Sequence, residues 1–87
     1  MTNAREVLMD TDANAIAGLF EEIFGRDPTT SEHICQSCRS RNLIGVHRLY
    51  RGAGLVLRCP TCGEPAAAFV SVRDGHAISL HGTWMLA

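Results

Sequence analysis

A periodic apolar stripe in the first third of the chain predicts a helix. Five large apolar residues follow one another at helical spacing and form one face of a 3.6-residue helix; they are Ile16, Leu19, Phe20, Ile23 and Phe24. Asp12 precedes the stripe as an N-cap, because its carboxylate can accept from the free amides of the first turn. Gly25 supplies a left-handed stop and Pro28 prevents continuation. The pattern predicts an amphipathic helix from Ala13 to Phe24.

The apolar face of this helix has two interpretations. We favour packing against the rest of the chain as core or as a dimer contact. The alternative is an anchor offered to a larger partner, in which an amphipathic helix lies in an apolar groove. The same five residues are the candidate helix interface in either case.

After a turn-rich linker at Arg26–Glu32, the apolar residues come in short runs that predict antiparallel strands. One strand is predicted from Leu43 to Tyr50 and a second from Leu55 to Arg58. The segment Arg51–Gly54 is the expected turn between these two strands.

A further hairpin is predicted around Asp74-Gly75, a strong turn pair. Its strands are Phe69–Arg73 and Ala77–Leu80. A bulge at Gly75 would place the side chains of Val70 and Val72 on one face with those of Ile78 and Leu80. The segment Trp84–Leu86 is expected either to extend the last strand or to pack under the helix.

Two Cys-x2-Cys pairs, separated by 20 residues, predict a metal site. Two residues between cysteines let the chain curl so that both sulfurs point at one ion, while backbone amides of the turn donate to them. Gly63 suits the sharp turn after the second pair, and Arg39 stands at the same place in the first. The expected ligands are Cys35, Cys38, Cys59 and Cys62.

Four thiolates around one Zn²⁺ form a closed tetrahedral site with no position for water or substrate, so the expected cofactor is one structural zinc ion. Iron is a less favoured rival, because rubredoxin sites use the same four thiolates. A redox Cys-x-x-Cys would open a helix beside a βαβ unit, which neither pair does. Two disulfides are disfavoured if the protein is cytosolic. His33 lies close to Cys35 and is a remote alternative ligand.

Charge is unevenly distributed along the chain. Residues 1–32 carry seven acids and two arginines, whereas residues 33–63 carry five arginines and no acid. These candidate contacts for nucleic acid or a partner are Arg39, Arg41, Arg48, Arg51 and Arg58. They can equally offset the formal charge of −2 on a zinc–thiolate site. A net charge of −1 and few aromatic residues favour charge compensation or a protein interface over a nucleic-acid surface.

Composition restricts the class of protein. A chain of 87 residues is one small domain or a compact unit with a tail, and such chains often need a metal to be stable. No apolar run is long enough to span a membrane, and acids occupy the N-terminal region where a signal peptide needs an apolar core. We therefore expect a cytoplasmic protein.

An enzymatic activity is not expected. His47, His76 and His81 fall in strand-like stretches, where histidines more often satisfy a local hydrogen bond. Ser71 and Ser79 lack the context of a nucleophile elbow. Neither an open metal position nor a polar pocket for a small-molecule substrate is evident.

The order of several motifs resembles an uncharacterised family of small bacterial zinc-ribbon proteins, filed as a domain of unknown function. These motifs are the opening Asp12–Leu19 (DANAIAGL), Glu22–Gly25 (EIFG), the two cysteine pairs with Leu55–Arg58 before the second, and Ile78–Gly82 (ISLHG). Ala13 departs from the glycine expected in that opening. The resemblance covers roughly residues 10–87 and implies a zinc ribbon with an N-terminal helix, but no activity.

Together these patterns predict a small metal-stabilised α+β fold, with an N-terminal helix and a zinc ribbon of three to four antiparallel strands. Residues 1–32 form the expected tail, helix and linker, and residues 33–87 the zinc-ribbon domain. The expected function is a non-enzymatic interaction or adaptor module with a protein partner. The alternative is a nucleic-acid-associated ribbon at the transcription or translation machinery.

Overall fold

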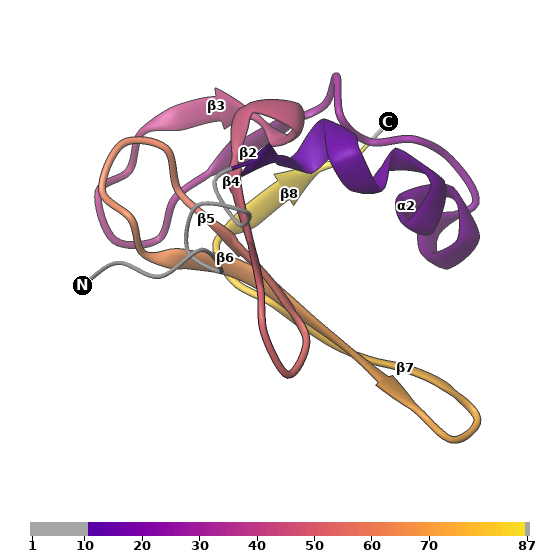
Figure 1. The fold of residues 1–87 in the computed structure, drawn as a ribbon. Helices are drawn as coiled ribbons and strands as arrows, with labels where there is room; N and C mark the ends of the chain where they lie inside the picture. The colour runs from indigo at the N-terminus through magenta and orange to yellow at the C-terminus, as the bar shows by residue number, and fades with distance from the viewer. Residues whose placement is uncertain (1–10, 87) are drawn as a thin grey trace.

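A computed structural model describes residues 11–86, which form short helical segments and two antiparallel sheets (Figure 1). The helical segments are η1 (3-10, Ala13–Ile16), α2 (α, Ala17–Phe24) and η2 (3-10, Ile44–Val46). The strands are β1 (Thr11–Asp12), β2 (Glu32–Ile34), β3 (Arg41–Leu43), β4 (Arg48–Arg51), β5 (Leu55–Arg58), β6 (Pro65–Val72), β7 (Gly75–Leu80) and β8 (Thr83–Met85). No helix within residues 11–86 has the length and apolar character needed to cross a membrane.

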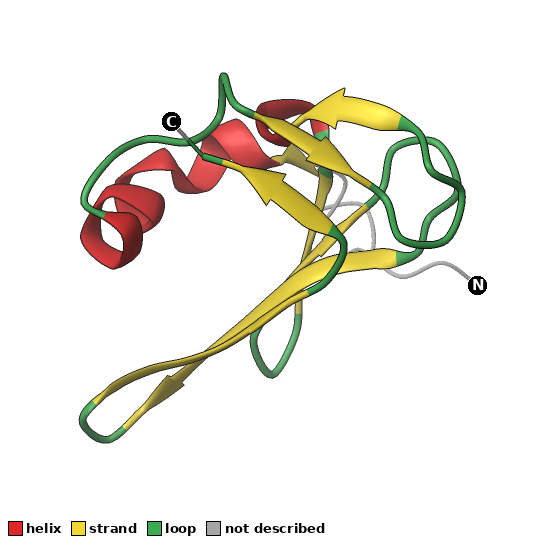
Figure 2. Cartoon of the chain, turned by 180° about the vertical axis from the view of Figure 1, so that it is seen from behind, coloured by secondary structure: helices red, strands yellow, loops and turns green. Residues whose placement is uncertain are grey.

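Strand pairing is more extensive than the three or four predicted strands. The larger sheet has the order β1-β4-β5-β6-β7 and the smaller one β3-β2-β8, and every pair is antiparallel (Figure 2). The strands that the pattern missed are β1, β2, β3 and β8, each two or three residues long. Segments this short are below the length at which alternation between apolar and polar residues can be recognised.

The predicted helix over Ala13–Phe24 is present, but its first turn is 3-10 and the α-helix begins at Ala17. The side chain of Asp12 accepts a hydrogen bond from the amide of Asn14 at 3.1 Å, as its role as N-cap predicts. Gly25 ends α2 with a φ of 78°, and its amide donates to the carbonyl of Glu21.

The helix lies against the same core as the larger sheet. Phe20 is fully buried, and its ring meets that of Phe69 from β6 edge-on, with 5.8 Å between centroids. The buried cluster consists of Ala13, Ile16, Phe20, Ile44, Leu49, Leu57, Ala67 and Phe69. Leu19, Ile23 and Phe24 pack against it, so all five stripe residues contact the chain's own core, as the favoured interpretation predicts. The division at residues 32 and 33 stays a prediction.

The continuous strand predicted from Leu43 to Tyr50 is wrong. Its middle forms the 3-10 turn η2, after which β4 begins at Arg48. The amide of Gly45 donates to the carbonyl of Thr29 at 2.9 Å, and a Cβ added at Gly45 would lie only 2.9 Å from that oxygen. Because only glycine allows this approach, the linker docks here and interrupts the strand.

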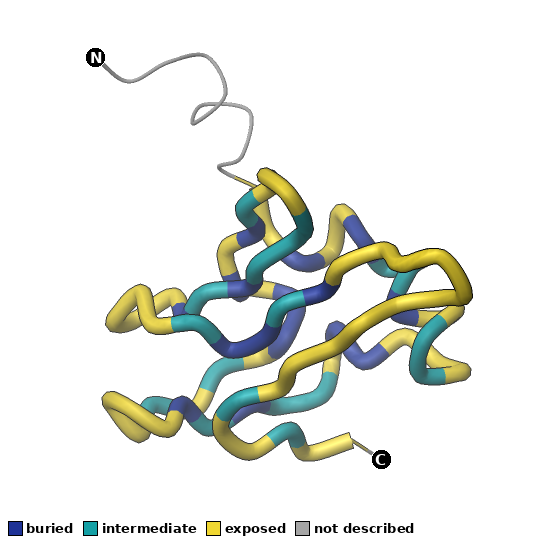
Figure 3. The backbone as a smooth tube through the Cα atoms, turned by 90° about the horizontal axis from the view of Figure 1, so that it is seen from below, coloured by how far each residue is buried: buried dark blue, intermediate teal, exposed yellow. Residues whose placement is uncertain are grey.

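The hairpin of β6 and β7 projects from the body of the molecule and is exposed along β7 (Figures 1 and 3). The hairpin predicted around Asp74-Gly75 is present, and it has no bulge at Gly75, because the register is regular from Val72 opposite Gly75 to Ala67 opposite Leu80. Val70 therefore faces Ala77, whereas Ile78 faces Phe69 on the other side of the sheet.

Trp84 belongs to β8, which pairs with β2 and does not extend β7. Its ring lies 6.0 Å from that of Phe24 and 5.5 Å from that of His33. Of the two predicted placements, packing under the helix is therefore confirmed. This contact joins the smaller sheet to α2.

Candidate metal centre

The four cysteines, which lie in two separate turns of the sequence, come together at one point. All four Sγ atoms lie within 4.8 Å of one another. Sγ of Cys35 is 3.6 Å from that of Cys62, and Sγ of Cys38 is 3.8 Å from that of Cys59. Tetrahedral sulfurs at about 2.3 Å from a zinc ion are about 3.8 Å apart. The cluster therefore has the dimensions of a four-thiolate site, and its sulfurs are far from the roughly 2.05 Å of a disulfide.

Two matching turns, or knuckles, position the sulfurs. In the knuckle over residues 35–40 the amide of Arg39 donates to the carbonyl of Cys35, and the amide of Cys35 to the carbonyl of Ser40. In the knuckle over residues 59–64, Gly63 and Cys59 make the equivalent bonds, to Cys59 and Glu64. Arg39 has a φ of 65° and Gly63 one of 84°. Arg39 thus adopts the left-handed conformation that glycine adopts in the second knuckle.

Backbone amides within each knuckle point at the sulfurs. The amides of Ser37 and Cys38 donate to Sγ of Cys35 at 3.4 and 3.5 Å, and the amide of Thr61 donates to Sγ of Cys59 at 3.4 Å. Such bonds stabilise thiolates rather than thiols. Cys35 and Cys59 are buried, whereas Cys38 and Cys62 lie at the surface.

Ser40 adds a side-chain contact that the motif did not predict. Its hydroxyl oxygen lies 3.0 Å from Sγ of Cys38 and 3.5 Å from Sγ of Cys59. The side-chain amide of Asn42 donates to the same hydroxyl oxygen at 3.1 Å, which leaves the hydroxyl hydrogen for a sulfur. The feature of the sequence that could have indicated this contact is the position of Ser40, two residues after the second cysteine of a pair.

The thiols differ in how readily they ionise. The side-chain and backbone hydrogen bonds from Ser40 lower the pKa of Cys38. Burial opposes ionisation of Cys59, but hydrogen bonds from Ser40 and nearby amides outweigh it and lower its pKa to about 6. The amide of Glu64 favours the thiolate of Cys62, yet burial and the three neighbouring thiols raise its pKa to about 12. Cys62 thus keeps its proton most firmly in the cluster, and a bound cation would favour its release.

The five candidate arginines do not form one basic face. Arg41 pairs with Glu32 in the smaller sheet at 3.5 Å. Arg58 donates to the carbonyl of Gly63 and lies over the ring of Tyr50 at 5.4 Å. Arg48 is opposite Arg58 in the register, whereas Arg51, three residues along β4, faces the other side of the sheet. Arg39 belongs to the first knuckle.

Two buried histidines lie apart from the sulfur cluster. His33 is not part of that cluster, so the remote alternative of a histidine ligand gains no support from the described residues. Instead its Nε2 faces the carbonyl oxygen of His81 at 2.8 Å and its ring meets that of His47. Nδ1 of His47 lies 3.0 Å from the carbonyl oxygen of Leu43, which is a local hydrogen bond of the predicted kind.

The geometry thus defines a small α+β protein with a four-cysteine cluster suited to a metal ion. The chain belongs to a family of unknown function, DUF6510, which matches residues 4–87. No curated protein and no solved structure matches the chain. Functional inference therefore rests on the residues themselves.

Proposed function

We propose that this protein is a non-enzymatic interaction module, a zinc ribbon whose shape depends on one structural Zn²⁺. The observation that supports this function is the convergence of four sulfurs, from two matching knuckles, to within 4.8 Å of one another. The proposed ligands are Cys35, Cys38, Cys59 and Cys62. When bound, the ion supplies charge neutralisation and cross-linking of the two knuckles.

The donor set favours a structural role over a catalytic one. Four thiolates complete the tetrahedral coordination of zinc, so no position is left where water or substrate could be activated. The cytoplasm, where thiols stay reduced, is the compartment in which such a site persists without oxidation. Iron in the same thiolate set is the rival that elemental analysis distinguishes.

A protein partner is favoured over nucleic acid by the placement of the arginines. Arg41 is paired with Glu32, and Arg58 is engaged by Gly63 and Tyr50. Arg48 and Arg51 face opposite sides of the larger sheet. A surface that binds the phosphate backbone of nucleic acid needs several cationic side chains on one face, where they can contact phosphates.

The experiment combines metal analysis with affinity purification from the source cell. We expect one zinc per natively isolated chain, and partner proteins that are recovered by the zinc-loaded chain and lost when the metal is removed and not restored. A chain reloaded with zinc is the matched control. A metal-free chain with the complete fold would refute the structural zinc. A salt-sensitive shift of labelled nucleic acid, weakened by Arg39→Ala or Arg51→Ala, would replace the protein partner with nucleic acid.

A further inference from the structure

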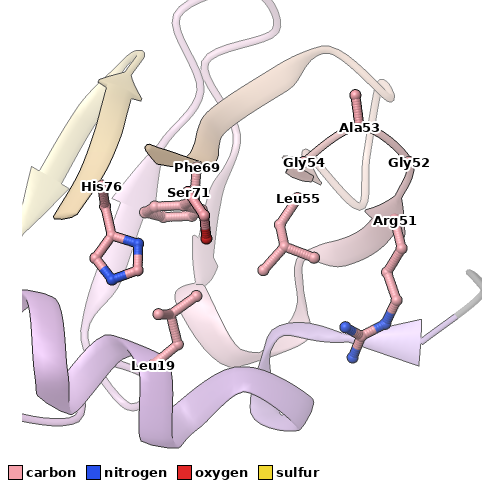
Figure 4. A pocket seen from close by; sticks show the side chains of 9 residues that line it. All are labelled: Leu19, Arg51, Gly52, Ala53, Gly54, Leu55, Phe69, Ser71 and His76. Carbon is pink, nitrogen blue, oxygen red and sulfur yellow. The ribbon is translucent and has the colours of Figure 1, made fainter. Parts of the chain in front are cut away.

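A second site lies away from the cysteines, between α2 and the larger sheet. It is a hollow of about 290 Å³ at the end of the sheet where the Arg51–Gly54 turn meets the β6–β7 hairpin (Figure 4). Its apolar surface comes from Leu19, Leu55 and Phe69, and its polar groups from Arg51, Ser71 and His76. Ligand pockets in proteins begin at about this volume, so a small ligand is the appropriate size.

The register of the sheet explains why these side chains converge. Arg51 is opposite Leu55 on β5, and Leu55 is opposite Phe69 on β6. Ser71 is opposite His76 on β7. Directly opposite residues share one face of a sheet, and alternate residues along a strand do so as well. All five side chains therefore lie on the face that carries the core, where Leu19 of α2 meets them.

Arg51 is a charged residue on the face of the sheet that carries the core. It follows the fully buried Leu49 by two positions, so the alternation that directs Leu49 into the core also directs Arg51 toward the hollow. Its guanidinium has no ion pair or hydrogen bond to any residue in 11–86. Figure 4 shows Arg51 and His76 at opposite ends of the hollow, with the apolar side chains between them.

The charge of the hollow is positive. Among residues 11–86 no acid lines it, and Glu22 beside it lies 3.8 Å from Nε2 of His76, at the end remote from Arg51. The turn that carries Arg51 is held closely against β6, since a Cβ added at Gly54 would lie 2.6 Å from the carbonyl oxygen of Phe69. A fixed turn, a permanent cation and an apolar floor together select an anion with an apolar part.

We propose that this hollow binds a carboxylate carried on a short apolar group. The carboxylate pairs with the guanidinium of Arg51, whose planar fork matches its two oxygens. The apolar group covers Leu19, Leu55 and Phe69. A free short-chain carboxylic acid and the C-terminal residue of another chain share this chemistry. Binding here goes beyond the proposed zinc-dependent module and uses none of its ligands.

The test is a titration of the zinc-loaded full chain, in which binding is measured from the shifts of the protein's amide resonances. The probes are 4-methylpentanoate, its neutral amide, and an acetylated tripeptide that ends in leucine with either a free or an amidated terminus. We expect saturable shifts around Leu19, Leu55 and Ser71 with the carboxylates alone. Tighter binding of the free acid identifies a small molecule as the ligand, and tighter binding of the tripeptide identifies a chain terminus.

Arg51→Gln is expected to weaken binding by about tenfold or more, because it removes a hydrogen-bonded charge. Arg41→Gln is the matched control, an arginine on the other sheet that leaves the hollow intact. The absence of saturable shifts, equal binding of the neutral amide, or unchanged binding by Arg51→Gln would each overturn the assignment. Zinc content and the remaining spectrum, read from the same samples, report on the metal site separately.

Discussion

Nε2 of His47 lies 3.2 Å from Nδ1 of His33, inside the molecule, and the two rings meet edge to face. Their outer nitrogens face the carbonyl oxygens of Leu43 and His81. Each neutral imidazole ring carries one N–H hydrogen. Only two of the three contacts (His47 to Leu43, His33 to His81 and His47 to His33) can therefore be hydrogen bonds at one time. A third proton would complete the chain of hydrogen bonds, but it would bring a charge into the core. Burial is the larger effect, and together with the neighbouring His33 it lowers the pKa of His47.

This lowered pKa predicts that acid destabilises the fold. The unfolded chain takes up a proton at His47 near pH 6.5 while the folded chain resists it, so stability is complete above pH 6.5 and falls as the pH drops toward the folded pKa. The expected slope is at most about 1.4 kcal/mol per pH unit. Chemical unfolding of the zinc-loaded chain at pH 7.5 and 5.5 measures it.

His47→Asn is the informative variant, because its amide can still donate toward the carbonyl of Leu43. We expect it to be less stable at pH 7.5 but to lose less stability on acidification than the wild type. His81→Asn, which leaves the backbone carbonyl in place, serves as the control. All these chains keep four cysteines, so competition between protons and metal is common to them. A wild type that gains stability on acidification would show that the pair holds a shared proton instead.

Removal of the metal is expected to unfold the chain, so that no cooperative unfolding transition is then observed. Structural zinc binding contributes on the order of 10–16 kcal/mol near neutral pH, comparable with the whole stability of a domain. We expect chelation to collapse the amide dispersion of residues 33–69 and to reduce the helical signal, since the apolar face of α2 then has no core to pack against. Circular dichroism and amide spectra before and after chelation, with zinc restored as the control, test this. A chelated chain with an unchanged spectrum would contradict it.

Ser40→Ala is expected to lower zinc affinity by about tenfold or more, the usual effect of removing a partner of a metal ligand. The reason is the loss of the hydroxyl that lies 3.0 Å from Sγ of Cys38 and 3.5 Å from Sγ of Cys59. Competition with a chromophoric chelator measures the affinity. Ser37→Ala makes the same chemical change in the same knuckle but removes no side-chain contact to a sulfur, so it should bind zinc as the wild type does. Equal zinc affinities for the two variants would show that the Ser40 hydroxyl does not stabilise the metal site.

Substitution by alanine is expected to have opposite effects on stability at two glycines. A Cβ at Gly82 would lie 2.5 Å from the carbonyl oxygen of Ile34, and the residue has a φ of 76°. Gly18, within α2, has nothing within 4 Å of the added atom. We expect Gly82→Ala to destabilise the fold by several kcal/mol, from left-handed strain and backbone overlap, and Gly18→Ala to stabilise it by about 0.5–1 kcal/mol. Denaturant midpoints of both variants are the measurement, and a neutral Gly82→Ala would contradict the close contact.

The sequence predicted the parts of the fold that depend on local chemistry. The helix stripe, its caps and the strand Leu55–Arg58 follow from side-chain periodicity and from residues that accept particular backbone angles. The cysteine spacing likewise predicted the cluster. Contacts between distant segments were not predictable in this way: Gly45 interrupts a strand only because Thr29 docks against it. The hollow at Arg51 was missed for the same reason, since four strands and a helix supply its side chains.

The pairing of β8 with β2 has a consequence for how the protein is made. Trp84 covers His33 and Phe24, yet it is synthesised after every cysteine and after the helix. Translation adds about 5–20 residues per second, so the side of the helix that Trp84 will cover stays open for several seconds in the nascent chain. The core would therefore close last at Trp84, and until then the apolar side of α2 would be accessible to chaperones.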